Sequence, residues 1–511
     1  MVTMNQDDDS ANLPLFPPGY RASGVLLHVE SLPSPYGVGD AGAASFRWVD
    51  RLQAAGQSWW HALPLGPHGI SSFAGSELLI SPDSLVEDGL VTEHDCAGYT
   101  FPATHIDYSV VVPFKHHLLE TAWSRFRAGA GTDLKPEFDR FRFDHFHWLE
   151  DHALFRALKS RFQNAHYLKW PQELVRREPA ALDQARHELA GEIEQACLTQ
   201  FLLFRGGRKL KDYASARGVR MIGDLPFFVS PDSSDVWAHP ELFLLDADRH
   251  PKFVAGVPPD CHSSQGRRWG NPVYNWEALR QTGYRWYLDR LRAALNFVDV
   301  VRLEHFRGFA AAWHVPVGAP TAQCGQWVPG PGAPLFQAMR EEFGLLPFVA
   351  EDLGMMTADV RKLLDHIEAP GTRVLQHAFD GHSDNPHLPE NCSANSVVYT
   401  ANHDSLASRT WHERLTAPAR QNLSRYLRRN CEPAEAAPAF IRLAWSCRAA
   451  LAIAPLQDVM NLGGDRAEAN ASWRCTEEVL HARAFEWLRE ITRRTNRMSA
   501  QDAPRRMGMA S

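Results

Sequence analysis

The sequence predicts an α/β fold, namely a (β/α)8 TIM barrel with a large helical insertion and elaborated loops around its cleft. Eight short apolar segments recur along the chain, each followed by Gly, Pro or Asp and then by sequence with helical periodicity. Alternation of this kind is typical of α/β folds. Several segments end in a charged residue or a histidine, and barrel enzymes carry their catalytic groups at the C-terminal ends of the strands. The pattern also allows a doubly wound open sheet as the alternative.

The expected strands are short and widely spaced. Each is a nearly continuous apolar run, which is typical of strands that are buried on both faces. A length of 511 residues fits either one barrel or three small domains. The order of the motifs has to decide between these two arrangements. In chain order, the expected strands span residues 24–28, 58–65, 219–229, 297–304, 347–353, 373–379, 396–400 and 451–458.

A long stretch between the second and third expected strands, at about residues 81–217, is dominated by helical periodicity, which predicts a mostly helical insertion. We expect its aromatic residues Phe141, Phe143, Phe146 and Trp148 to pack against the barrel and not to form a separate sugar site. Residues 21–498 are expected to form the barrel with this insertion. Residues 1–20 and 499–511 are expected to be loosely held tails.

The net charge and the spacing of the cysteines limit the partners and the cellular compartment that the sequence predicts. The net charge of −7 is spread along the chain without basic blocks, which argues against nucleic acid or an anionic membrane as a partner and suits a neutral substrate. The eight cysteines have no metal-binding spacing, so we interpret them as thiols in a reducing cytoplasm. The sequence shows no signal-peptide pattern and no apolar run of about 18 residues. We therefore expect a cytoplasmic protein without a membrane segment.

Three acidic residues stand at the ends of expected strands, namely Glu304, Glu351 and Asp404. Although they are far apart in sequence, the C-terminal ends of barrel strands meet at one rim. Cleavage of a glycosidic bond with retention needs one carboxylate as nucleophile and one protonated carboxyl as acid, about 5–5.5 Å apart. Three carboxyls on one rim would supply this chemistry and add negative charge beside the transition state.

Two basic residues accompany these acids. Arg302 precedes Glu304 by two residues and so shares its strand face, where it could hold a carboxylate ionised, while His403 could bind a sugar hydroxyl. A single buried Arg–Glu pair is more often a structural ion pair than a catalytic one. Three charged strand ends in this order favour a catalytic cluster.

The motifs around these residues resemble those of the amylomaltases, also called disproportionating enzymes or 4-α-glucanotransferases. One is the stretch Gly223-Asp224-Leu225-Pro226-Phe227-Phe228-Val229 and another is Trp269-Gly270-Asn271-Pro272. The similarity extends over about residues 20–475 in the family's order. It includes residues 24–28, 35–40, 56–60, 63–67, 302–309, 350–354 and 395–400.

The resemblance implies an amylase-related (β/α)8 enzyme that acts on α-1,4-glucans or maltooligosaccharides by double displacement and needs no metal or other cofactor. It assigns Glu351 as acid/base, Asp404 as the aspartate that stabilises the transition state, and Glu304 to the nucleophile position. The residues that it implies in substrate binding are Arg302, His403, Asp224, Trp269, Asn271 and Tyr36.

The sequence departs from the family at the nucleophile, where an aspartate is expected and Glu304 stands. The additional methylene moves the carboxylate by about 1 Å, a displacement that can cost roughly a hundredfold in rate. Smaller departures surround the same cleft. They are a missing loop after Pro67, Arg267 in place of glutamine, Cys261-His262 in place of an aromatic pair, Asn402 and Ser405 beside His403-Asp404, and residues 467–471 in place of a Met-Asn-x-Pro-Gly motif.

The leading hypothesis is therefore an active or weakly active 4-α-glucanotransferase, with Glu304 as the position that would reduce its activity. Two alternatives remain open on the sequence. One is a catalytically impaired homologue that binds α-glucan, and the other is a weak α-1,4-glucan hydrolase, since the missing loop is where contacts to an acceptor sugar are expected.

Overall fold

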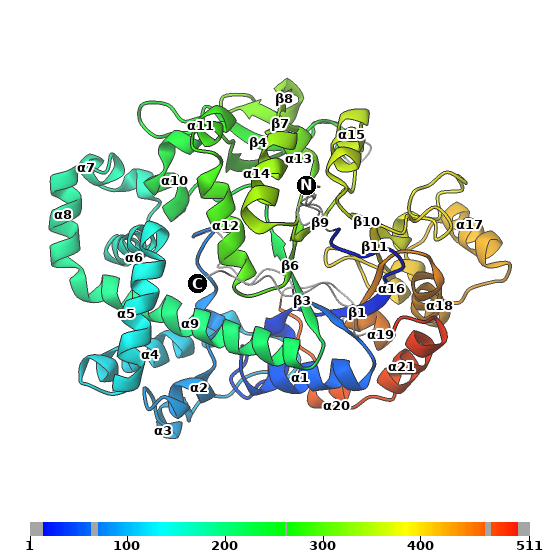
Figure 1. Cartoon of the computed structure of the whole chain (residues 1–511), viewed down its shortest axis with the longest axis horizontal. Helices are drawn as coiled ribbons and strands as arrows, with labels where there is room; N and C mark the ends of the chain where they lie inside the picture. Colours follow the sequence, from blue (N-terminus) through cyan, green and yellow to red (C-terminus); the bar gives the residue numbers. More distant parts are fainter. Residues whose placement is uncertain (1–13, 63–69, 261–262, 465–471, 499–511) are drawn as a thin grey trace, which may run out of the picture.

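In the computed structural model, eight parallel strands close into a barrel (Figure 1). The structure describes residues 14–62, 70–260, 263–464 and 472–498. Around the barrel the strand order is β1-β12-β11-β10-β9-β6-β3-β2. Closure of the sheet confirms the predicted barrel over the open-sheet alternative. The strands are β1 Ala22–Leu26, β2 Trp59–His61, β3 Arg220–Leu225, β6 Val300–Leu303, β9 Phe348–Ala350, β10 Gly371–Val374, β11 Ser396–Tyr399 and β12 Leu451–Pro455.

All eight expected strands exist, although some of their ends differ from the prediction. The run at 373–379 forms a strand only up to Val374, and β10 starts earlier, at Gly371; Leu375–His377 is a short 3-10 helix. The run at 451–458 ends as a strand at Pro455, which caps helix α19, Leu456–Val459. Proline favours the start of a helix and cannot donate to a sheet. The last residues of the 58–65 run lie outside the described residues.

The two faces of each strand have different neighbours. In β6, Val300 belongs to an apolar cluster with Ile222, Val349 and Val397, whereas Val301 packs in the larger cluster shared with the helices. Side chains two apart share a strand face, so Arg302 lies on the same face as Val300. The apolar residues fill the lower part of the barrel, and the charged side chain follows towards the C-terminal end of the strand.

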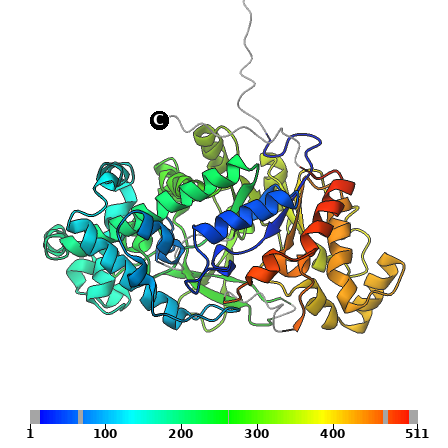
Figure 2. The same cartoon turned by 90° about the horizontal axis from the view of Figure 1, so that it is seen from below.

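The predicted helical insertion fills the chain between β2 and β3. Its longest helix, α9 at Ala190–Ala216, contacts β3 and the barrel helix α1 at Ala43–Ala54. The insertion (cyan) lies on one side of the barrel and the C-terminal helices (orange and red) on the other (Figures 1 and 2). Its other helices are α2 Pro82–Glu87, α3 Glu93–Cys96, α4 Tyr108–Arg127, α5 Lys135–Asp144, α6 Phe146–Arg161, α7 Gln172–Val175 and α8 Pro179–Glu188.

The expectation for the aromatic residues of the insertion holds only in part. Phe141 and Trp148 are buried, and their rings lie 5.2 and 5.8 Å from the ring of Phe204. Phe143 and Phe146 are instead 81% and 68% exposed, so the expectation is wrong for these two. Phe138 and Phe141 are three positions apart and share the inner face of α5, whereas Phe143, two positions further on, faces away from it.

A second, antiparallel sheet lies outside the barrel and was not predicted. Its strand order is β5-β4-β7-β8. A search for apolar runs does not find this sheet, because its strand β5 has the sequence RRWGNP and is largely exposed. The strands are β4 Phe253–Val257, β5 Arg267–Pro272, β7 Ala311–Pro316 and β8 Gln326–Pro329.

The remaining helices connect and cover the strands. No helix among the described residues is long and apolar enough to cross a lipid bilayer. The bounds are α10 Ser234–Ala238, α11 Trp276–Gln281, α12 Arg285–Leu295, α13 Arg307–Ala310, α14 Ala333–Phe343, α15 Ala358–Ile367, α16 Ser408–Glu413, α17 Ala417–Leu427, α18 Pro433–Ser446, α20 Glu477–Leu480 and α21 Ala484–Arg494.

Arg497 stabilises the seam of the barrel, where the first and last strands pair. The β1 and β12 strands pair in parallel, with Ala22 opposite Leu451. The fully buried Arg497 donates hydrogen bonds to the carbonyl of Ala22 at 2.8 Å, and to those of Trp445, Cys447 and Ala449 at 2.7–2.9 Å. One guanidinium therefore binds both the start of the barrel and the approach to its last strand.

Candidate active site

The structure brings the three predicted acids into one cleft, of about 410 Å³. Glu304 follows β6, Glu351 follows β9 and Asp404 follows β11, so each comes from the C-terminal end of a different strand. Their convergence fits the prediction made from the order of the strand ends. The cleft is lined by Pro226, Phe227, Phe228, Trp269, Asn271, Glu304, His305, Glu351, His403 and Asp404.

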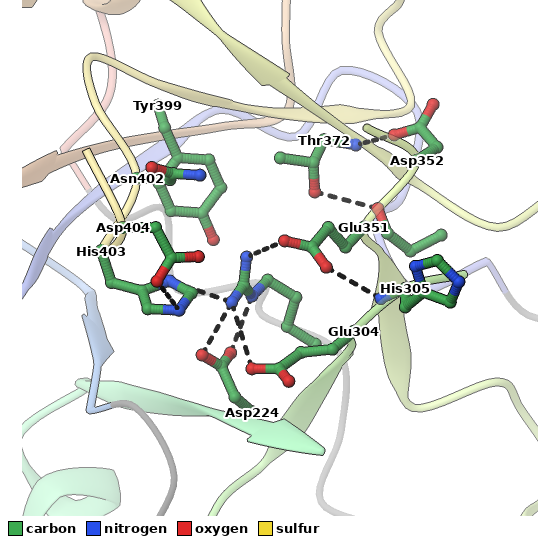
Figure 3. Close-up of polar contacts among 12 residues, drawn as sticks. Asp224, Glu304, His305, Glu351, Asp352, Thr372, Tyr399, Asn402, His403 and Asp404 are labelled. Atoms are coloured by element: carbon green, nitrogen blue, oxygen red, sulfur yellow. Dashed lines mark hydrogen bonds and ion pairs between the residues drawn. The ribbon is translucent and has the colours of Figure 1, made fainter. Parts of the chain in front are cut away.

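The side chains of Asp224, Glu304, Glu351 and His403 point towards one another (Figure 3), and the guanidinium of Arg302 faces all four. Its Nε and Nη2 donate to the two carboxylate oxygens of Asp224, both at 2.8 Å, and its Nη1 donates to Glu351 Oε1 at 2.9 Å. Nη2 also lies 3.6 Å from Glu304 Oε1 and 3.1 Å from His403 Nδ1. Burial lowers the pKa of Arg302, but the carboxylates of Asp224 and Glu351 outweigh this effect and raise the pKa well above its usual value, so the guanidinium stays charged. Arg302 thus fixes four cleft side chains relative to one another.

Glu351 is held by two donors, one on each carboxylate oxygen. Besides Arg302, the backbone N–H of His305 donates to Oε2 at 2.8 Å. His305 has a left-handed backbone, with φ of 49°, a conformation that is uncommon for a residue other than glycine and is often found at functional sites. The same turn places the His305 ring 4.8 Å from the ring of Trp269. The backbone after β6 therefore orients Glu351 and helps to shape the cleft wall.

Glu304 has the weakest contact with Arg302 among the acids that reach it, at 3.6 Å. The pKa of Glu304 is raised to about 8, first by burial and then by the negative charge of Asp224, while the positive charge of Arg302 opposes both effects. The carboxyl of Glu304 is therefore mostly protonated at neutral pH. A protonated carboxyl is a poor nucleophile, so Glu304 must lose this proton before it can attack a sugar.

His403 and Asp404 form the opposite side of the cluster. Because Arg302 can only donate, His403 Nδ1 accepts, and this leaves the proton on Nε2, which lies 3.3 Å from Asp404 Oδ1. The Asp404 side chain is 74% exposed, far more than Glu304 or Glu351. Asp404 therefore faces the open part of the cleft, where a sugar would cover it.

Asp224 has a further partner that the motif analysis missed. Its Oδ1 lies 2.8 Å from Nε2 of His61, and Nδ1 of His61 lies 3.1 Å from the hydroxyl of Tyr399. Both residues are the last of their barrel strands, β2 and β11. The strand-end rule that pointed to Glu304 could have found them, because each ends an apolar run with a polar group.

Asp224, Glu304 and His403 offer ligand atoms within 4.8 Å of one another, a spacing that a metal ion could use. Each of the three, however, already faces the guanidinium of Arg302. The cation of the cluster is thus an arginine, and the donor set fits an arginine-centred cluster better than a metal centre.

Comparisons with known proteins agree with this geometry. The model of the 4-alpha-glucanotransferase family matches residues 27–478. The chain belongs to this family. It is 41% identical to a 4-alpha-glucanotransferase of Aquifex aeolicus over 482 residues, which are 91% of this chain and 97% of that protein. The corresponding protein of Thermus thermophilus is 40% identical over 499 residues, with 94% and 99% covered.

A solved structure extends the family comparison to three dimensions. The amylomaltase from Streptococcus agalactiae, determined in complex with acarbose, superposes with a TM-score of 0.88 at 31% identity and covers 94% of this chain and 100% of that one. The amylomaltase from Corynebacterium glutamicum, at 15% identity and a TM-score of 0.70, shares the fold. The elaborated barrel is therefore the family's architecture.

Two of the expected substrate-binding residues, Trp269 and Asn271, lie on β5 at the cleft. Trp269 is 42% exposed and packs its ring edge to face with Phe228. The side-chain amide of Asn271 donates to the carbonyl of Val229 at 2.8 Å, so it tethers the edge of this sheet to the loop after β3.

Tyr36 is not brought to this cleft. Its hydroxyl donates to Asp83 of helix α2, and its ring stacks on Phe114 of α4 at 6.1 Å. These contacts give Tyr36 a packing role between the loop after β1 and the insertion. Of the positions where the chain departs from the family's motifs, residues 68–69 after Pro67, 261–262 and 467–471 lie outside the described residues.

Proposed function

We propose that this protein is a 4-α-glucanotransferase, which moves α-1,4-glucan segments between maltooligosaccharides by a retaining double displacement. The observation that carries the proposal is the convergence of Glu304, Glu351 and Asp404 in one cleft of a chain that belongs to the 4-alpha-glucanotransferase family. Two carboxyls that contact the same guanidinium flank a single position, where a glycosidic bond can lie between them.

In the first displacement, the ionised carboxylate of Glu304 attacks the anomeric carbon of the donor glucan. Protonated Glu351 gives its proton to the glycosidic oxygen, so the remainder of the chain leaves as a free sugar with a 4-hydroxyl group. A covalent glycosyl ester on Glu304 is the result. Asp404 is the negative charge that faces the cationic sugar ring in the transition state.

In the second displacement, an acceptor sugar replaces the leaving group. Glu351, now ionised, removes the proton from the acceptor's 4-hydroxyl group, and that oxygen attacks the anomeric carbon and releases Glu304. The product has the same anomeric configuration as the donor. Transfer exceeds hydrolysis when the acceptor outcompetes water, and the exposed ring of Trp269 offers an apolar face on which a sugar can stack.

The polar side chains of the cleft suit a glucan, whose hydroxyl groups both donate and accept hydrogen bonds. His403 lies beside Arg302 at the base of the cleft, and we assign it to the binding of the sugar hydroxyls, whereas the Asp224 side chain is 0% exposed and acts through Arg302. The complex of the Streptococcus agalactiae amylomaltase with acarbose supports a sugar ligand in this fold.

We place the activity in the cytoplasm. The seven cysteines that the structure describes are all free thiols, which fits a reducing compartment. The assignment is tested by fractionation of cells that express the protein.

Incubation of the protein with maltotriose, followed by separation of the products by chain length, tests the function. A transferase forms glucose together with a ladder of longer maltooligosaccharides. Glucose and maltose alone would identify a hydrolase, and unchanged maltotriose would identify a binding protein. Glu351→Gln is the matched control, because it removes the acid while it keeps a side chain of the same size, and it should abolish the ladder.

A further inference from the structure

A chain of buried hydrogen bonds lies beneath the cleft. It runs from Tyr399 to His61 and from His61 to Asp224, with distances of 3.1 and 2.8 Å, and Asp224 then accepts two hydrogen bonds from Arg302 at 2.8 Å each. All four residues are at most 7% exposed. They come from four of the eight barrel strands, β11, β2, β3 and β6. His61 and Tyr399 are too deeply buried to touch a sugar, and the two displacements described above do not use them.

The hydrogen-bond partners determine which atom carries each proton in this chain of hydrogen bonds. The carboxylate of Asp224, paired with Arg302, can only accept hydrogen bonds. Nε2 of His61 therefore carries a proton and donates a hydrogen bond to this carboxylate. Nδ1 of His61 then accepts, and the hydroxyl of Tyr399 is its donor. Burial lowers the pKa of His61 and outweighs the opposing effect of the Asp224 carboxylate, and the positive charge of Arg302 lowers the pKa further. The imidazole is therefore neutral and has a fixed tautomer.

This fixed tautomer determines the orientation of the guanidinium. Asp224 receives three donors, one from His61 and two from Arg302, so its carboxylate cannot rotate without losing one of them. Because Nε and Nη2 of Arg302 are bound to Asp224, its remaining terminal nitrogen, Nη1, points to Glu351 at 2.9 Å. The outer side of Nη2 faces Glu304 at 3.6 Å. A turn of Asp224 would move both contacts.

We propose that His61, held by Tyr399, is a positioning residue for the reaction: it fixes Asp224 and thereby the orientation of Arg302 that aligns Glu351 and Glu304. The inference rests on the proposed glucan transfer. His61 acts through Asp224 and Arg302 and has no contact with the substrate.

Two substitutions of His61 separate this role from simple packing. The amide nitrogen of glutamine reaches the place of Nε2, whereas that of asparagine reaches only the place of Nδ1. We expect His61→Gln to keep kcat for maltotriose disproportionation within about threefold of the wild type, because the donor to Asp224 remains. His61→Asn should lower kcat at least about tenfold and change KM less than about twofold. Tyr399→Phe removes only the outer donor, and it should lower kcat about threefold.

The thermal midpoint and circular dichroism of each variant show whether it folds. If His61→Gln and His61→Asn lose activity equally, or only in proportion to the unfolded fraction, His61 has a packing role and the proposal is wrong. Full activity of His61→Asn would also overturn it. If the wild type itself forms no ladder from maltotriose, the proposed function fails instead, and the two failures are thus distinguishable.

A second measurement determines the tautomer of His61 in the absence of substrate. In the 15N NMR spectrum of the wild type, labelled at histidine and assigned with His61→Gln, we expect His61 to show the Nε2–H tautomer and no titration between about pH 5.5 and 8.5. A protonated ring or the Nδ1–H tautomer in this range would contradict the proposal.

Discussion

Glu304 carries the largest chemical difference between this chain and the motif that it resembles. The longer side chain still reaches the cleft, but its contact with Arg302 is 3.6 Å, whereas Glu351 lies at 2.9 Å. We expect Glu304→Asp to raise kcat by about tenfold or more, because the carboxylate withdraws by about 1 Å towards the position that the resemblance implies. Initial rates of maltotriose disproportionation measure the change. Equal or lower activity would contradict this geometric account, and Glu304→Gln should be inactive.

The raised pKa of Glu304 makes a second prediction at the residue scale. The nucleophile reacts only when it is ionised, and its pKa is about 8, so the fraction of ionised Glu304 grows about tenfold per pH unit below that value, and this form is reactive as long as Glu351 keeps its proton. We expect kcat/KM to rise steeply between pH 6 and 8. A profile that is flat or falls over this range would show that Glu304 is already ionised at pH 6.

The raised pKa of Glu304 also makes the stability of the folded protein depend on pH. In the unfolded chain the pKa of a glutamate is about 4.3, so the folded state holds its proton over a wider range. The stability that this proton contributes is present at low pH and is lost as pH rises through about 8. Relative to the wild type, Glu304→Gln should therefore gain thermal stability between pH 6 and pH 9, by about 2 °C. Calorimetry at the two pH values measures the difference.

At the scale of single elements, strand β5 provides the exposed aromatic wall of the cleft. Trp269→Ala should raise KM for maltoheptaose about tenfold, which corresponds to a loss of about 1.4 kcal/mol of stacking, and leave kcat within about threefold. The ring is partly exposed, so the fold should be unaffected. An unchanged KM would show that no sugar stacks on this face.

The elements also show which structural information the sequence contains. Strands of the barrel are buried on both faces, so they appear as apolar runs, and the charged residues at their ends predicted Glu304, Glu351 and Asp404 together. Strand β5 has the sequence RRWGNP and looks like a loop because only its backbone pairing makes it a strand. His61 and Tyr399 were missed for another reason. Both are the last residues of their strands, so the strand-end rule could have marked them as candidates, but their role depends on a contact between strands β2 and β11 that the sequence does not show.

The whole molecule depends on closure of the barrel at the seam of β1 and β12. Arg497 is fully buried and binds carbonyls on both sides of this seam. Arg497→Ala would leave several buried carbonyls without donors, and we expect it to destabilise the protein by about 3 kcal/mol or more. Arg494→Ala is the control, because that side chain is largely exposed and its ion pair with Glu490 contributes little. Denaturant unfolding of both variants measures the difference.

The position of Arg497 so late in the polypeptide has a consequence for synthesis on the ribosome. Ala22 emerges early, yet the guanidinium that binds it is added 475 residues later. At roughly 5–20 residues per second, β1 waits at least about 24 seconds for this partner. The seam of β1 and β12 lacks this hydrogen-bond donor throughout, so a stalled ribosome that has not yet exposed Arg497 should carry a protease-sensitive chain, and exposure of Arg497 should be the event that confers resistance.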